Sequence, residues 1–258
     1  MIAAQRRALI LEQLRREGAG SIVALADKIG VSPSTIRRDL EFLTVGGYIV
    51  RSHGGALLNE PHRTTFEPES EIGAHVARAA KEAIGAYAAS LVEEGQSVIF
   101  DSSSTVLEAA KAVVARGLRL TVCTNDIGTA LALARSENLQ LVVLGGTTRR
   151  GSLTTIGDPG LSFLERLHAD VAFIGIHALV GGRLSETSID VSAMKRRMIS
   201  CAARAVLLAD SSKFRHPAFC DVCDVTEVHT VVTDSGLADS ERQRLTDAGV
   251  EVTVVSDT

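Results

Sequence analysis

The sequence predicts an α/β protein with two parts: a small helical module at the N-terminus, followed by a larger domain built on a mostly parallel sheet. From about residue 74 onward, short apolar segments alternate with helical segments, the pattern of a parallel sheet covered on both faces. Charge is also divided unevenly. Residues 1–56 carry a formal charge of +3 and the rest carries −7, against −4 for the whole chain. A basic module beside an acidic one points to a nucleic-acid partner for the first part.

Composition excludes several classes of protein. With 258 residues, 45% of them apolar, the chain is long enough for one or two domains with real cores. The absence of Trp and the presence of only two Tyr argue against stacking platforms for single-stranded nucleic acid. No secretory signal is visible, and the longest segment without formal charge, Val171–Gly182, is too short to span a bilayer. We therefore expect a soluble, cytoplasmic protein with reduced thiols and no membrane partner.

Two helices are predicted before residue 30. Ile10, Leu11 and Leu14 share one face of the first, which should end near Gly18. Ser21 is suited to N-cap the second, and Gly30 to end it. The apolar face of the second helix consists of Ile22, Leu25, Ala26 and Ile29.

The third helix, about 33–44, begins with the strongest start signal, Ser32 as N-cap and Pro33 at the first helical position. Two short helices joined by a Gly-containing turn follow the helix-turn-helix plan, in which the second helix reads DNA with its N-terminal residues. Gly46-Gly47 then leads to two short strands separated by a glycine turn, the outline of a wing. The residues expected to contact DNA are Ser32, Ser34, Thr35, Arg37, Arg38, Arg51 and His53. The alternative is that Arg37 and Arg38 are only a solvated helix face.

The N-terminal residues resemble the DeoR family of bacterial transcription regulators. The resemblance lies in Val31–Leu40 (V-S-P-S-T-I-R-R-D-L), in Gly47–Arg51, and in His53–Ala56 (H-G-G-A). It implies a winged helix-turn-helix over residues 1–58. Pro61, Pro68 and the polar residues around them then predict a linker at 59–72, which leaves 73–258 for the second domain.

Strands and helices alternate through the second domain. The predicted strands are Ser97–Phe100, Arg119–Thr124, Leu139–Leu144, Asp170–Ile176, Ala205–Ala209, His229–Thr233 and Glu251–Val255. The predicted helices are Ala74–Glu93, Thr105–Arg116, Asp126–Arg135, Asp158–Leu167, Ile189–Ala203 and Asp239–Ala248.

Ligands of such sheets bind beyond the carboxyl ends of the strands, and polar or glycine residues follow four of the predicted strands. Hydroxyls, helix N-termini and the cation Lys213, with Arg149 as a second candidate, suit a phosphate and the hydroxyls of a polyol. The alternative is that these residues only cap helices. The residues expected to bind an effector are Asp101, Ser102, Ser103, Ser104, Thr105, Thr124, Asn125, Gly145, Gly146 and Lys213.

The family resemblance extends through this second domain. It implies a sensor that resembles ribose-5-phosphate isomerase and CoA-transferase folds and binds a phosphorylated sugar. The matching segments are Asp101–Thr105, Thr124-Asn125, Gly145-Gly146, Gly157, Asp170–Gly175 and Asp210–Phe214. Two positions depart from the pattern: Ser103 stands where the family has Gly, and His177 stands where the family has a small residue.

Two further motifs carry weaker signals. Cys220 and Cys223, with His216 nearby, could be read as a metal site, but one C-x-x-C without a second pair favours plain thiols. The run Lys195–Arg197 between Met194 and Met198 predicts the solvated side of an amphipathic helix, with an effector or subunit contact as the alternative. No metal or cofactor is expected.

These features favour a DNA-binding transcriptional regulator, a repressor of carbohydrate genes released by a phosphorylated metabolite, acting as a dimer or tetramer on double-stranded operator DNA. A second hypothesis is an isomerase or acyl-CoA transferase with a DNA-binding appendage, for which Asp101 and Glu186 are the available carboxylates. A third is an architectural DNA-binding protein with no effector. We expect no enzymatic activity.

Overall fold

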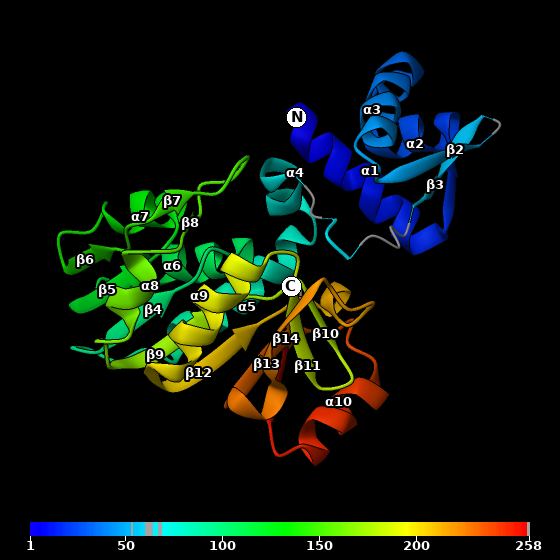
Figure 1. The fold of residues 1–258 in the computed structure, drawn as a ribbon. Coiled ribbons are helices and arrows are strands. Elements are labelled where there is room, and N and C mark those ends of the chain that lie inside the picture. Colours follow the sequence, from blue (N-terminus) through cyan, green and yellow to red (C-terminus); the bar gives the residue numbers. More distant parts are fainter. Residues whose placement is uncertain (53, 60–63, 67–68, 257–258) are drawn as a thin grey trace. The chain divides into compact units, whose positions relative to one another are not determined.

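The computed structural model describes residues 1–52, 54–59, 64–66 and 69–256. The chain forms two compact units, Met1–Arg78 and Ala79–Thr258 (Figure 1). No helix within the described ranges is both long and apolar enough to cross a membrane.

The first unit is a three-helix module with a small antiparallel sheet. Its helices are α1 (Ala3–Glu17), α2 (Ile22–Ile29) and α3 (Pro33–Val45), and its strands are β1 (Ala19–Ser21), β2 (Ile49–Ser52) and β3 (Gly55–Leu58), in the order β1-β3-β2. The predicted caps are confirmed: the Ser21 side chain accepts from Ala24 N, and the Ser32 side chain accepts from Thr35 N. The helix-turn-helix and its wing are therefore present as the sequence predicts.

A fourth helix, α4 (Ser70–His75), belongs to this first unit. Ile72 is buried in the same core as the three helices. The backbone N–H of Glu69 donates to the Tyr48 hydroxyl at 2.7 Å, and the ring of Phe66 packs edge-on against Tyr48. The segment expected to be a linker, 59–72, thus packs in part onto the DNA-binding module.

The boundary between the units consequently differs from the expected one at residue 73. The single helix predicted over Ala74–Glu93 is two helices, α4 and α5 (Arg78–Ser90). They are separated by Val76, which is extended, and Ala77, whose φ is +53°. A positive φ is unfavourable for a residue with a side chain, and a helix cannot continue through it.

The second unit is built on a seven-stranded, wholly parallel sheet in the order β15-β14-β12-β9-β4-β5-β6. The strands are β4 (Ser97–Phe100), β5 (Leu120–Thr124), β6 (Leu139–Val143), β9 (Ala169–Ile174), β12 (Ala202–Leu208), β14 (Thr230–Asp234) and β15 (Glu251–Val255). Its helices after α5 are α6 (Ser104–Arg116), α7 (Ile127–Leu133), α8 (Gly160–Leu164), α9 (Ile189–Ser200) and α10 (Asp239–Asp247). All seven predicted strands and the alternation with helices are confirmed, with ends that shift by a few residues.

Side chains of the strands alternate between two cores, one on each face of the sheet. Val98 and Phe100 of β4 join the core that contains residues of α5, α6 and α7, whereas Ile99 joins the core that contains residues of α8, α9 and α10. In Figure 1, α9 crosses the sheet over β9 and β12. This double covering explains why the strands are apolar on both faces.

A smaller antiparallel sheet packs on the α9 side. It contains β10 (Ala178–Val180), β11 (Arg183–Glu186) and β13 (Cys220–Asp224), in the order β10-β11-β13. A two-stranded hairpin, β7 (Thr147–Thr148) with β8 (Thr155–Ile156), follows β6. None of these five strands is predicted, because each is short and most carry polar residues.

Candidate functional site

The N-terminal half of α3 presents an exposed, basic surface. Ser34, Arg37 and Arg38 are exposed, while the next residue, Asp39, is buried. Thr35 is only half-buried, and its hydroxyl lies 2.9 Å from the Ser32 hydroxyl, which also caps the helix. Of the predicted contacts on α3, Ser34, Arg37 and Arg38 are therefore the most available to a partner.

The wing adds one more cation. Arg51 is exposed on β2. His53 of the turn lies outside the described residues. Gly55 pairs closely with β1, where an added Cβ would lie 2.2 Å from Gly20 O. That close approach explains why the wing sequence contains glycine at this position.

In the second unit the polar strand exits meet at the carboxyl edge of the sheet. The chain runs from β4 through β5 to β6 on one side and then returns to β9, β12, β14 and β15 on the other. The order therefore reverses between β4 and β9. Ligands of open α/β sheets bind in the crevice at such a switch point, which here lies beside Asp101 and Gly175.

Asp101 organises this switch point. Its Oδ1 accepts from Ser103 N, and its Oδ2 accepts from Gly175 N, both at 2.8 Å. The carboxylate is 1% exposed. Asp101 therefore joins the exits of β4 and β9 through charge-assisted hydrogen bonds.

Lys195 of α9 completes the cluster. Its ammonium donates to Asp101 Oδ2 and to Gly175 O, both at 2.7 Å, and lies 3.1 Å from Glu186 Oε1. Burial alone would lower the pKa of Lys195, but the negative charges of Asp101 and Glu186 outweigh it and raise that pKa above its ordinary value. The prediction that Lys195 faces solvent is wrong. In the same run, Arg196 is exposed and Arg197 pairs with Glu165.

Ser103 fills the space beside Gly175. Its hydroxyl N-caps α6 by accepting from Val106 N at 3.2 Å. A Cβ added at Gly175 would lie 2.0 Å from Ser103 Oγ, so the two positions are sterically coupled. Ser102 and Ser104 are half-buried beside this cap, and Thr105 is buried. The Ser103 hydroxyl thus caps α6 and also occupies the space beside Gly175, which follows β9.

The exit of β5 is closed by the β7–β8 hairpin. Thr124 Oγ1 accepts from Asp126 N, and Asn125 Nδ2 donates to Thr155 O at 3.0 Å. Asn125 Oδ1 is buried and has no hydrogen-bond partner within the described part of the chain. Burial raises the pKa of Asp126, and the charge of Asp101 adds to this effect. The residues that follow β4 and β5 are therefore electrostatic neighbours.

Gly145 and Gly146 follow β6 on the outer side of this edge. Both are exposed, and both lie against the segment that continues from β8. A Cβ at Gly146 would be 2.5 Å from Ile156 O. Close backbone packing accounts for these two glycines.

The exit of β12 supplies the cation predicted for an anionic effector. Asp210 caps a short 3-10 helix, Ser211–Lys213, and Lys213 is half-buried. Burial alone would raise the pKa of Asp210, but the positive charges of Lys213 and of the buried Lys81 on α5 lower it below its ordinary value. The exits of β12, β9, β4, β5 and β6 thus follow one another along one edge, in that order.

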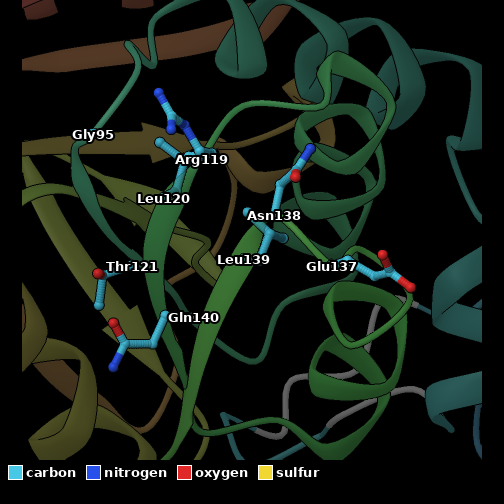
Figure 2. Close-up of a pocket in the computed structure, with 8 residues that line it drawn as sticks. All are labelled: Gly95, Arg119, Leu120, Thr121, Glu137, Asn138, Leu139 and Gln140. Carbon is cyan, nitrogen blue, oxygen red and sulfur yellow. The ribbon is translucent and has the colours of Figure 1, made fainter.

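An open hollow of about 440 Å³ lies at the opposite, amino edge of the sheet (Figure 2). Figure 2 shows Leu120 and Leu139 at the first positions of β5 and β6. Arg119 beside them is paired with Glu94. No residue predicted to bind an effector contributes to this hollow, which is lined by Gly95, Arg119, Leu120, Thr121, Glu137, Asn138, Leu139 and Gln140.

Cys220 and Cys223 are arranged as separate thiols. Both belong to β13, and the register of β13 against β11 shifts between them. Cys220 Sγ lies 3.3 Å from Glu186 O, and burial raises the pKa of Cys223 to about 12. Among the described residues no group of three His, Cys, Asp or Glu side chains could hold a metal ion.

Both units match family models. The DeoR-like helix-turn-helix domain matches residues 6–62, and the DeoR C-terminal sensor domain matches residues 76–235. The chain is 34% identical to the HTH-type transcriptional regulator GlpR of Haloferax volcanii, with 98% of each chain covered. It is 30% identical to the HTH-type transcriptional repressor GlcR of Bacillus subtilis, covering 91% of this chain and 89% of that one. It is also 30% identical to the L-fucose operon activator of Haemophilus influenzae, covering 91% and 93%.

Among solved structures, ribose 5-phosphate isomerase A from Neisseria gonorrhoeae aligns with 52% of this chain and 52% of its own, at 15% identity and a TM-score of 0.39.

Proposed function

Because the chain belongs to the DeoR family of helix-turn-helix transcriptional regulators, we propose that it is an operator-binding repressor of carbohydrate genes, released by a phosphorylated sugar or a related metabolite. The observation that carries the DNA-binding half is the exposed Arg37–Arg38 pair on a capped recognition helix. Arginine suits both guanine edges and phosphates. A repressor is favoured over an activator because two of the relatives, GlcR and the aga operon regulator of Escherichia coli O157:H7, are named as repressors and one is named as an activator.

The sensing half rests on the carboxyl edge of the sheet. Lys213 and the N-terminus of α6 suit an anion, whereas the buried Asn125 Oδ1, which has no hydrogen-bond partner among the described residues, suits a hydroxyl group. A molecule with a phosphate and several hydroxyls matches both kinds of group. Binding regulates transcription only if the effector has different affinities for the DNA-competent and incompetent states.

The first experiment is a gel shift on the DNA upstream of the protein's own gene, with a panel of phosphorylated metabolites and their unphosphorylated counterparts. We expect a shifted complex that at least one phosphorylated compound dissociates and its counterpart does not. A complex that responds to no compound, together with no thermal stabilisation, would favour an architectural protein. Absence of any complex would contradict DNA binding itself.

Replacing Arg38 with Ala should weaken operator binding by about 1–3 kcal/mol and relax specificity at one base pair, if its guanidinium contacts a base edge. Fluorescence anisotropy on operator and mismatched duplexes measures both effects. Arg16→Ala, at the far end of α1 and highly exposed, is the matched control. Equal operator affinity of Arg38→Ala and wild type would exclude the base contact.

Replacing Lys213 with Ala should leave operator affinity within about twofold and reduce the sensitivity to effector by tenfold or more, because the charge-assisted contact to the anion is lost. Titration of the operator complex with the active metabolite gives the midpoint. Lys111→Ala on the exposed side of α6 controls for the loss of a positive charge. A normal midpoint in Lys213→Ala would remove this residue from the site.

We infer that the second unit senses its ligand without transforming it. The candidate carboxylates, Asp101 and Glu186, both contact the Lys195 ammonium, and Asp101 is further held by two backbone N–H groups. A general base needs a carboxylate within reach of a substrate proton. Turnover of aldose or ketose phosphates by the purified protein would contradict this inference. We further propose a dimer or tetramer in the cytoplasm, because two-fold operators require two recognition helices.

A further inference from the structure

Two arginines in the first turns of α1 share a single carboxylate of the recognition helix. Arg6 donates through Nε to Asp39 Oδ2 and through Nη2 to Oδ1, the latter at 3.2 Å. Arg7 Nε also donates to Oδ1 at 3.2 Å. Asp39 is 1% exposed, so both of its oxygens are fully engaged inside the unit.

This cluster holds a fixed excess of positive charge. Two guanidiniums meet one carboxylate, which leaves a net charge of +1. The Arg7 guanidinium is also stacked over the Phe42 ring, 3.4 Å from its centroid, a cation–π contact that holds its plane. A guanidinium has five N–H donors, and Asp39 engages two of those on Arg6 and one on Arg7. The other donors are already oriented, and the two side chains remain 16% and 22% exposed.

Two arginines on one carboxylate are more than is needed to attach α1 to α3. One arginine would suffice to neutralise Asp39, and the second adds repulsion. The position adds a small further cost, because Arg6 lies at the end of the first turn of α1, where positive side chains oppose the helix dipole. The first turn of α1 contains no acidic residue, and the Gln5 side-chain oxygen accepts from Ile2 N at 3.3 Å. A bound anion would offset all of these costs.

We propose that Arg6 and Arg7 form a preorganised clamp for one phosphate of the DNA backbone. Asp39 directly follows Arg37 and Arg38 on α3, so the clamp is attached to the helix that reads the bases. Phosphate contacts fix the register of a recognition helix without reading sequence. The proposal rests on the proposed DNA-binding function, and it assigns Asp39 the role of positioning the clamp.

The test is the salt dependence of DNA binding by the full chain. Fluorescence anisotropy gives Kd for the upstream duplex and for an unrelated duplex between about 50 and 200 mM KCl. Each phosphate contact contributes about 0.9 to the slope of log Kd against log salt. Arg7→Gln should lower that slope by about 0.9 on both duplexes and weaken both equally. Arg16→Gln, on the same helix and 70% exposed, is the control that should keep the wild-type slope.

A second variant, Asp39→Asn, keeps the proposal testable if Arg7→Gln destabilises the fold. Asp39→Asn keeps both arginines and their charge, so the clamp predicts a slope at least as steep as that of wild type. It also predicts weaker binding to both duplexes, because the carboxylate no longer positions the two guanidiniums. A shallower slope in Asp39→Asn overturns the proposal. An Arg7→Gln protein that melts earlier but keeps the wild-type slope also overturns it, because the pair would then only attach α1 to α3.

Inorganic phosphate distinguishes DNA from a free anion as the source of the phosphate. At matched ionic strength we expect it to change the melting temperatures of wild type and Arg7→Gln equally. A stabilisation seen only in wild type, together with equal salt slopes for wild type and Arg7→Gln, would assign the pair to a free anion and overturn the clamp. If wild type binds neither duplex, the proposed function fails as well. If wild type binds and the slopes are equal, the clamp fails and the proposed function stands.

Discussion

Replacing Lys195 with Met should lower the free energy of unfolding of the second unit by about 3–5 kcal/mol. The substitution leaves Asp101 and Glu186 as buried carboxylates that have lost their shared cation, and removal of one partner from a buried ion pair costs that much. Urea unfolding followed by far-UV circular dichroism measures the change. The expected loss exceeds that of a surface substitution because all three charged side chains are buried.

The neighbouring Arg196→Met is the matched control, since Arg196 is exposed on the same helix and should change stability by no more than about 0.5 kcal/mol. The pKa of Lys195 is raised, so its stabilisation is fully present below the ordinary lysine value near 10.4 and is lost only as the pH rises through the raised value. Lys195 therefore stays charged from about pH 6 to 9, and its own titration adds no pH dependence to the difference between wild type and Lys195→Met over that range. Equal effects of the two substitutions would show that the buried cluster contributes nothing.

Replacing Gly175 with Ala should destabilise the second unit by about 2–4 kcal/mol. The new methyl group would lie 2.0 Å from Ser103 Oγ, and such overpacking costs about 1–3 kcal/mol. Displacement of Ser103 would also break the N-cap of α6, worth about 1 kcal/mol. Thermal and urea unfolding both report the loss.

A double-mutant cycle tests whether the two positions are coupled. Ser103→Gly removes the clashing hydroxymethyl group, and Gly at an N-cap costs only a few tenths of a kcal/mol. The double variant should therefore recover most of the stability lost in Gly175→Ala, with an interaction energy above about 1 kcal/mol. Additive losses would contradict the coupling. Recovery would explain how Ser at position 103 is compatible with Gly at position 175.

The N-terminal module could be predicted closely because its signals are local. Ser21 and Ser32 cap helices within three residues of themselves, and Pro33 and Gly30 mark a start and a stop. By contrast, α4 depends on Ile72 reaching a core formed far earlier in the chain. No short-range sequence pattern predicts such a contact, so the sequence of this segment is read as a linker.

The main sheet was predictable for a different reason. Strands buried on both faces have few alternatives to apolar residues, whereas β11 and β13 carry Arg183, Glu186 and Asp221 among their short runs. Because β11 and β13 pair antiparallel, charged residues on one strand can pair with charged residues on the other, as Arg183 does with Asp221. Pairing of this kind has no signature in a single segment.

The candidate site could be predicted at the strand exits but not at its centre. Asp101 stands at a strand end, which the sequence reveals, whereas its partner Lys195 lies 94 residues later on a helix. Helical periodicity alone assigns a lysine between two methionines to solvent. Only the fold shows that two carboxylates, Asp101 just after β4 and Glu186 on β11, neutralise it.

The position of β4 at the middle of the sheet also determines when the second unit can fold during synthesis. Ile99 of β4 pairs with Ala172 of β9, so the central pairing must wait until the ribosome has made the residues between them, about 4–15 s at 5–20 residues per second. The first unit has no such delay, because its contacts are complete by Arg78. In each nascent chain the residues of the first unit are therefore complete before the central strands of the second unit can pair.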